Sequence, residues 1–134
     1  MSSIISVVTN IDNIDNLNIV NFEFYGMQLS MMSLDLNENI KVGAKVKLGV
    51  NPTHIAIAKD FSGVVSYSNQ LKSTIKSIQN GKLLSSIKLS INDEVEIESI
   101  ITVNSSIKMD LKIGDEVTAF IKASELSILE VIDD

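Results

Sequence analysis

The 134-residue chain contains no cysteine, no tryptophan, no arginine and only one histidine. The absence of cysteine excludes disulfides and thiolate chemistry. With one histidine and no cysteine, nucleophilic catalysis lacks its usual parts, and we predict that the protein is not an enzyme. His54 has no second histidine or cysteine to accompany it, so we expect a structural or exposed residue rather than a metal ligand. We expect neither a resident metal nor an organic cofactor.

The chain also has little positive charge and few aromatic side chains. Eleven lysines stand against seventeen acidic residues, which gives a net charge of −6, and aromatic residues make up 4%. Nucleic-acid binding proteins place clustered basic residues on phosphates and aromatic rings on bases, so we expect no nucleic-acid partner. No apolar run approaches the ~20 residues of a membrane span, and no secretory signal is visible at the N-terminus. We therefore expect no membrane insertion and a cytoplasmic location.

Two stretches of the chain repeat one pattern. Segment 40–58 aligns with segment 111–129 at an offset of 71 residues, with glycine on glycine and apolar residues on apolar residues. Segment 6–11 aligns with segment 73–78 at an offset of 67. Repetition at nearly constant spacing indicates a tandem duplication.

The duplication predicts two domains, residues 1–60 and residues 61–134. We call residues 2–58 the first copy and residues 66–131 the second copy. The two offsets differ by four residues, and we assign this difference to a longer hairpin in the second copy, at residues 92–99.

Both copies have the alternation of apolar and polar residues that is typical of β-strands. Segment 85–91 places its apolar residues on one face, and segment 18–24 does the same in the first copy. Segment 104–111 begins with Asn and Ser, which favour helix N-termini, and predicts one or two helical turns. This order of elements predicts an all-β fold with short helices, built as two tandem OB-like five-stranded barrels. Barrels of this size bury little surface alone, which favours oligomerisation.

Two segments of the second copy carry a further signal. They read NQLKSTIKSI (69–78) and LKIGDEVTAFIKAS (111–124). In spacing and type they resemble the Mop/TOBE type of molybdate-binding domain, which opens with Ser-Ala-Arg-Asn-Gln-Leu-Lys and closes with Lys-Ala-Ser. The first copy is similar only as a degenerate relative, so the whole chain resembles a di-domain molbindin. The resemblance implies a cytoplasmic protein that stores or buffers molybdate, a homo-oligomer (a trimer or a dimer of trimers), and oxyanion sites between subunits.

The resemblance also implies a set of ligand positions from the opening, middle and closing segments of the domain. Tyr67 departs from the family's alanine, and the serine that follows it departs from the family's arginine. A backbone N–H contact survives the second change, whereas a guanidinium contact does not. The implied molybdate ligands are Ser66, Ser68, Asn69, Thr102, Ser105, Lys122, Ala123 and Ser124.

These residue types suit a tetrahedral oxyanion. Molybdate carries no proton near neutral pH, so it only accepts hydrogen bonds. Hydroxyls, lysine ammonium groups and backbone N–H groups can all donate. Lys122 supplies the positive charge, and Ala123 is small enough for an anion to approach the backbone. Such a site disfavours monohydrogen phosphate, whose proton needs an acceptor, but does not separate molybdate from tungstate.

The first copy has few such donors. Asn51, Pro52 and Thr53 stand in place of the closing Lys-Ala-Ser, and Met31 and Leu34 stand in place of the two mid-domain hydroxyls. Apolar side chains cannot donate, and proline has no N–H. We predict that the first copy has lost an equivalent site and serves structure, with Thr53 the one residue that could line a weaker site.

Two other hypotheses are open at this point. Domains of this type are fused to DNA-binding helices in molybdate-responsive regulators and to transporter ATPases, so the chain could be a regulatory or transport-associated module that acts through a protein partner. It has neither a helix-turn-helix pattern nor a Gly-rich phosphate loop. Alternatively it is a duplicated OB protein that binds no anion, which the missing arginine and the missing first-copy donors favour.

Overall fold

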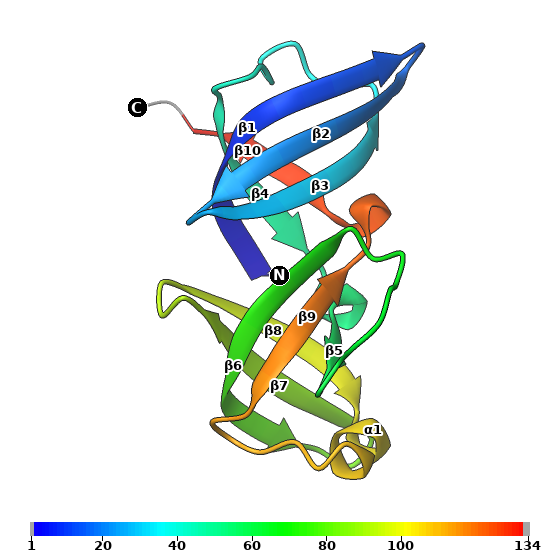
Figure 1. The fold of residues 1–134 in the computed structure, drawn as a ribbon, viewed down its shortest axis with the longest axis vertical. Helices are drawn as coiled ribbons and strands as arrows, with labels where there is room; N and C mark the ends of the chain where they lie inside the picture. Colours follow the sequence, from blue (N-terminus) through cyan, green and yellow to red (C-terminus); the bar gives the residue numbers. More distant parts are fainter. Residues whose placement is uncertain (1, 133–134) are drawn as a thin grey trace.

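A computed structural model describes residues 2–132 of the chain (Figure 1). These residues form ten strands, one short α-helix and two 3-10 turns. Within the same residues, no helix is long and apolar enough to cross a lipid bilayer. In chain order the elements are β1 (Ser2–Ile14), β2 (Leu17–Phe24), β3 (Met27–Leu34), β4 (Lys45–Val50), η1 (Pro52–His54), β5 (Ala56–Ala58), β6 (Asn69–Asn80), β7 (Leu84–Ile91), β8 (Val95–Thr102), α1 (Val103–Lys108), β9 (Glu116–Ile121), η2 (Ala123–Glu125) and β10 (Ser127–Val131).

The strands form two five-stranded sheets, one in the upper and one in the lower part of Figure 1. The strand order is β10-β4-β1-β2-β3 in the first sheet and β5-β9-β6-β7-β8 in the second. Every pairing is antiparallel. The predicted fold class, all-β with two tandem OB-like five-stranded units, is confirmed.

Each copy contributes its last strand to the sheet of the other copy. β5 of the first copy pairs with β9, with Ala56 opposite Phe120. β10 of the second copy pairs with β4, with Ser127 opposite Gly49. The membership of the two sheets therefore crosses the predicted division between residues 60 and 61.

The elements recur at the two predicted offsets. β4 and β9, like η1 and η2, are 71 residues apart, and β1 and β6, like β2 and β7, are 67 apart. Gly43 and Gly114 precede the equivalent strands β4 and β9 with φ of 93° and 94°, a conformation that glycine adopts without strain.

The assignment of the four-residue difference to one hairpin was wrong. The β7–β8 turn (92–94) is one residue longer than the β2–β3 turn (25–26). The other three residues lie in the connection that contains α1, which spans 103–115 in the second copy against 35–44 in the first. A helical turn consumes more residues over a given length than extended chain does, so the insertion is absorbed where the helix forms.

The core follows the alternation predicted from the sequence. Val20, Phe22 and Phe24 in β2, and Leu89 and Ile91 in β7, are all buried. Burial of each such side chain stabilises the fold by about 1.5–3 kcal/mol. In β2 and β7 the intervening residues, such as Glu23 and Lys88, face outward.

Two equivalent hydrogen-bond sets join the copies. The Asn69 amide, at the start of β6, accepts from the backbone N–H of Ser30 (2.7 Å) and donates to the Ser30 carbonyl (3.0 Å). Ser2, at the start of β1, accepts from the backbone N–H of Glu98 (2.8 Å). The first residue of each long strand therefore extends the ladder of a strand in the other copy.

Candidate functional site

The opening and closing segments of the second copy lie side by side. β6 and β9 are antiparallel neighbours, and Asn69 at the start of β6 pairs with Ile121 at the end of β9. This register brings the segment before β6, which contains Ser66 and Ser68, towards Lys122 at the exit of β9, and Tyr67 of that segment lines one cavity with Lys122. Ser66, Ser68, Lys122 and Ser124 are exposed, and Ala123 is half-buried.

Asn69 differs from the other predicted ligands because its side chain is completely buried. Its amide oxygen and nitrogen are both used by the Ser30 backbone. The side chain therefore fastens the entry to β6 onto the first copy and presents no free donor at the surface.

Thr102 and Ser105 form a hydroxyl pair at the start of α1. Thr102 is the N-cap residue, and its Oγ1 accepts from the backbone N–H of Ser105 at 3.1 Å. The same hydroxyl donates to Oγ of Ser105 at 2.9 Å, which leaves the Ser105 proton directed elsewhere. Both residues are exposed. The pair can offer one hydroxyl proton to a ligand.

A cavity of about 340 Å³ lies between the two 3-10 turns and the end of β8. Of the predicted ligands, only Lys122 lines it, and the β8 residues in its wall are the two that directly precede Thr102. Ser124 lines a different hollow, between β3 and β10. The lining of the first cavity is Thr53, His54, Ile55, Ala56, Tyr67, Ile100, Ile101, Lys122 and Glu125.

The predicted ligands therefore fall into three groups within one chain. The entry to β6 and Lys122 form one group, the hydroxyl pair at α1 forms a second, and Ser124 faces the hollow beside the first copy. A single described chain does not gather them around one cavity.

Tyr67, a departure from the family pattern, has a packing role. Its ring stacks on Phe120 with centroids 5.3 Å apart and planes at 16°. The ring of Phe61 contacts the Phe120 ring edge-on, with centroids 5.1 Å apart. These contacts hold the segment before β6 against β9, and so fix the position of Ser66 and Ser68.

Sequence reasoning missed the pairing of His54 with Glu125. Nδ1 of His54 lies 2.9 Å from Oε2 of Glu125, which joins η1 to η2. The two positions are 71 residues apart, so they are equivalent in the duplication. That spacing was the only signal in the sequence, since neither residue belongs to a motif.

Lys59 fixes the connection between α1 and β9. Its Nζ donates to the Asp110 carbonyl (2.8 Å) and the Met109 carbonyl (3.3 Å) and lies 3.1 Å from Oδ2 of Asp115. The backbone N–H of Lys112 also donates to that carboxylate, at 2.9 Å. This N–H first, and then the Lys59 ammonium, lower the pKa of Asp115.

The first copy lacks the equivalent donors. The carboxamide oxygen of Asn51 accepts both the backbone N–H (3.0 Å) and the hydroxyl (2.8 Å) of Thr53, so the Thr53 proton is already used. The predicted equivalence of Met31 and Thr102 was wrong, because Leu34 and Thr102 hold the same place: each is the last residue of its strand and pairs with the first residue of the preceding strand. Leucine at this place still offers no donor.

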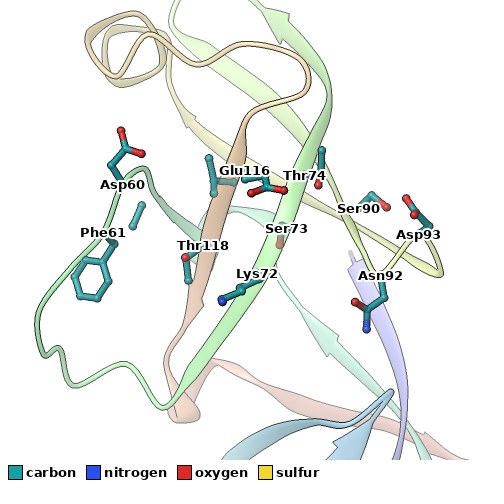
Figure 2. Close-up of a pocket in the computed structure, with 12 residues that line it drawn as sticks. Asp60, Phe61, Lys72, Ser73, Thr74, Ser90, Asn92, Asp93, Glu116 and Thr118 are labelled. Carbon is teal, nitrogen blue, oxygen red and sulfur yellow. The ribbon is translucent and has the colours of Figure 1, made fainter.

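A third hollow, of about 470 Å³, lies on the outer face of β6 and β9 (Figure 2). Its walls carry three carboxylates, those of Asp60, Asp93 and Glu116, against the single ammonium of Lys72. This excess of negative charge disfavours a dianion. Within residues 2–132, no group of three or more His, Asp or Glu side chains is placed to hold a metal ion.

Comparison with known proteins gives matches in both sequence and structure. Residues 66–128 match the TOBE domain family. The fold is similar to that of the cytoplasmic molybdate-binding protein ModG, solved with molybdate bound, with a TM-score of 0.86 and 23% identity over 94% of this chain and 93% of that one. A molybdate-binding protein from Sporomusa ovata is 34% identical over 51% of this chain and 100% of its own, with a TM-score of 0.48. No curated protein matches the chain in sequence.

These matches bear on two predictions. The likeness to ModG extends over both copies and supports the tandem OB-like architecture. The family match covers the opening and closing segments of the second copy, in which the resemblance was found. The second copy therefore belongs to the TOBE domain family, as its sequence predicts.

Proposed function

We propose that the protein binds molybdate or tungstate through donors of its second copy, and that it stores or buffers the anion in the cytoplasm. It acts as a binding protein rather than an enzyme and needs no organic cofactor. The observation that carries this proposal is the juxtaposition of exposed Ser66 and Ser68 with Lys122, at the entry to β6 and the exit of β9. The likeness of the fold to ModG, which was solved with molybdate, supports it.

The charge state of this group suits an anion. Among residues 2–132, Lys122 has no carboxylate within ion-pair distance, and the neighbouring carboxylate of Glu125 is paired with His54. An unpaired ammonium beside hydroxyls is a donor set that a dianion can satisfy without displacing an existing partner. Ala123 adds a backbone N–H and little bulk.

We further propose that a complete site requires a second copy of the chain. The Thr102–Ser105 pair and Ser124 lie apart from the Lys122 group in one chain, yet all are exposed. A neighbouring subunit can bring its own hydroxyl pair to the Lys122 group of the first. A homo-oligomer, a trimer or a dimer of trimers, is therefore part of the proposal.

Calorimetric titration tests this function. Folded protein at micromolar concentration is titrated with molybdate, tungstate, sulfate and phosphate. We expect molybdate and tungstate to bind, and phosphate to bind more weakly because its proton meets only donors. Absence of molybdate binding would refute the proposal.

The variant Lys122→Met tests the proposed ligand group. Loss of a charge-assisted hydrogen bond costs about 1.5–3 kcal/mol, which weakens molybdate affinity by about ten- to a hundredfold. Lys76→Met is the matched control, since Lys76 is an exposed lysine of β6 on the side of Asp93, away from Lys122 and from the hydroxyl pair at α1. Equal effects of the two variants would show that only the net charge matters.

A further inference from the structure

The cavity beside Lys122 contains a second basic group that the proposed function does not use. His54 of η1 lines this cavity together with Lys122, Glu125 and Tyr67. Its Nδ1 lies 2.9 Å from Oε2 of Glu125, and the two side chains are 47% and 37% exposed. Imidazole is the side chain that ordinarily changes its charge between about pH 5 and pH 8.

The charged and titratable groups that face His54 come from three segments. Glu125 belongs to η2, Lys122 directly follows β9, and Tyr67 precedes β6. The turn η1 also packs against β8.

The β8 carboxylates have partners on β7. Glu98 is hydrogen-bonded to the Ser86 hydroxyl, and Glu96 lies 3.8 Å from the Lys88 ammonium. The polar contact from β8 to this region is the Ser99 hydroxyl, which donates to the Ile55 carbonyl at 2.5 Å. Glu125 is thus the carboxylate that acts on the His54 ring.

The neutral state of His54 suits an anion less well than the protonated state. With Nδ1–H donating to Glu125, the other ring nitrogen, Nε2, presents a lone pair and can only accept. The charge of Lys122 is then balanced by that of Glu125. An oxyanion in the cavity would face an acceptor and no net positive charge.

The protonated state reverses both properties. Nε2–H becomes a donor, Nδ1–H keeps its bond to Glu125, and the cavity gains one positive charge. Because a dianion only accepts hydrogen bonds, it favours this state over the neutral one.

We propose that His54 is a proton-linked determinant of oxyanion affinity, so that the first copy tunes the site of the second. The proposal rests on the proposed function of the Lys122 group. By reciprocity, an anion that binds the protonated state better must raise the proton affinity of His54. Oxyanion affinity is therefore highest at the low end of the range in which histidine titrates, and falls as the pH rises through it.

Molybdate titration of the full chain at pH 6, 7 and 8 and low ionic strength tests this inference. We expect binding about three- to tenfold tighter at pH 6 than at pH 8, and a smaller ratio at high salt, because the groups are half-exposed. Calorimetry in two buffers of different ionisation enthalpy should detect uptake of a fraction of a proton per bound anion. The free anion stays unprotonated over this range, so the proton must go to the protein.

Two variants assign the proton. His54→Gln cannot take up a proton and should give a flat pH profile, whereas His54→Lys carries a fixed charge and should be both flat and tighter than His54→Gln. Glu38→Gln, in the exposed loop before β4, should keep the wild-type profile. Circular dichroism checks that each variant is folded.

The outcomes separate the two proposals. If the wild-type protein binds molybdate equally at all three pH values, or if His54→Gln keeps the pH dependence, the role of His54 is refuted and the proposed function stands. If the protein binds no molybdate at any pH, the proposed function itself fails.

Discussion

The turns η1 and η2 have nearly the same backbone and opposite chemistry. Asn51 and Lys122, which precede them, have φ/ψ of −68°/132° and −70°/145°. Asn51 closes its own turn by accepting from Thr53, whereas the Lys122 side chain makes no capping bond. The turn therefore forms whether or not the preceding side chain makes a capping hydrogen bond. Asn51 is thus used inside its own turn, whereas the Lys122 side chain makes no bond to its turn.

The largest effect should come from breaking the core of either copy. Phe22 and Leu89 are equivalent in the duplication, and both are completely buried. Phe22→Ala should cost about 3–5 kcal/mol of unfolding free energy and Leu89→Ala about 2–5 kcal/mol. Because the sheets exchange strands, each variant should unfold in a single transition. Urea denaturation followed by circular dichroism measures this, and two separate transitions would contradict the coupling of the copies.

The bonds that join the copies should differ in strength. Asn69→Ala removes two hydrogen bonds and leaves the Ser30 backbone without partners, at a cost of about 2–4 kcal/mol. The equivalent Ser2→Ala removes one bond to Glu98 and should cost about 1 kcal/mol. Chemical denaturation of the two variants gives the comparison. If Ser2→Ala and Asn69→Ala cost the same free energy of unfolding, the Asn69 amide is not the stronger of the two links between the copies.

The backbone N–H at position 123 can be removed without disturbing the turn. Pro52 holds the equivalent place in η1, and the extended backbone of Lys122 is what a following proline requires. Ala123→Pro should leave stability within about 0.5 kcal/mol and weaken molybdate binding about tenfold. Ala123→Gly keeps the N–H as a control. If titration gives the same affinity for Ala123→Pro and Ala123→Gly, the backbone at 123 does not donate to the anion.

The smallest effect on stability should come from the connection between β8 and β9, which contains α1 and has no helical counterpart in the first copy. The pKa of Asp115 is lowered by the Lys112 N–H and the Lys59 ammonium, so the ionised carboxylate stabilises the folded state. That contribution is present above the ordinary pKa of an aspartate and is lost as the pH falls through the lowered one. Asp115→Asn should be slightly less stable than wild type at pH 7, and the difference should shrink towards pH 3. Thermal melts at the two pH values measure it, and a constant difference would exclude this linkage.

Local patterns predicted the strands and the repeat, because alternation and spacing are properties of the residues themselves. The buried rows of β2 and β7 and the glycines before β4 and β9 are examples. The strand exchange could not be predicted in this way. A strand such as β5 would have the same residue pattern whether it paired with β9 of the second copy or with a strand of the first copy. The pattern therefore cannot tell which strand is its partner.

For the candidate site, too, local sequence could predict which residues are candidates but not how the two copies pack around them. The resemblance implies Lys122 and its neighbours as ligands, which stays a prediction. Their position near the segment that contains Ser66 and Ser68 follows from the register of β6 and β9. The burial of Asn69 against Ser30 depends on how the two copies pack, which no local motif encodes. The pairing of His54 with Glu125 has the same origin.

The pairing of β5, a strand of the first copy, with β9 of the second copy has a consequence for the evolution of the chain. If the first copy were deleted, β9 would become an unpaired edge, open to association with other chains. The first copy offers few groups to a ligand, but its strand β5 still covers an edge of the second copy's sheet. In a tandem chain of this kind, one copy can lose its ligand donors while the other copy still uses its strand.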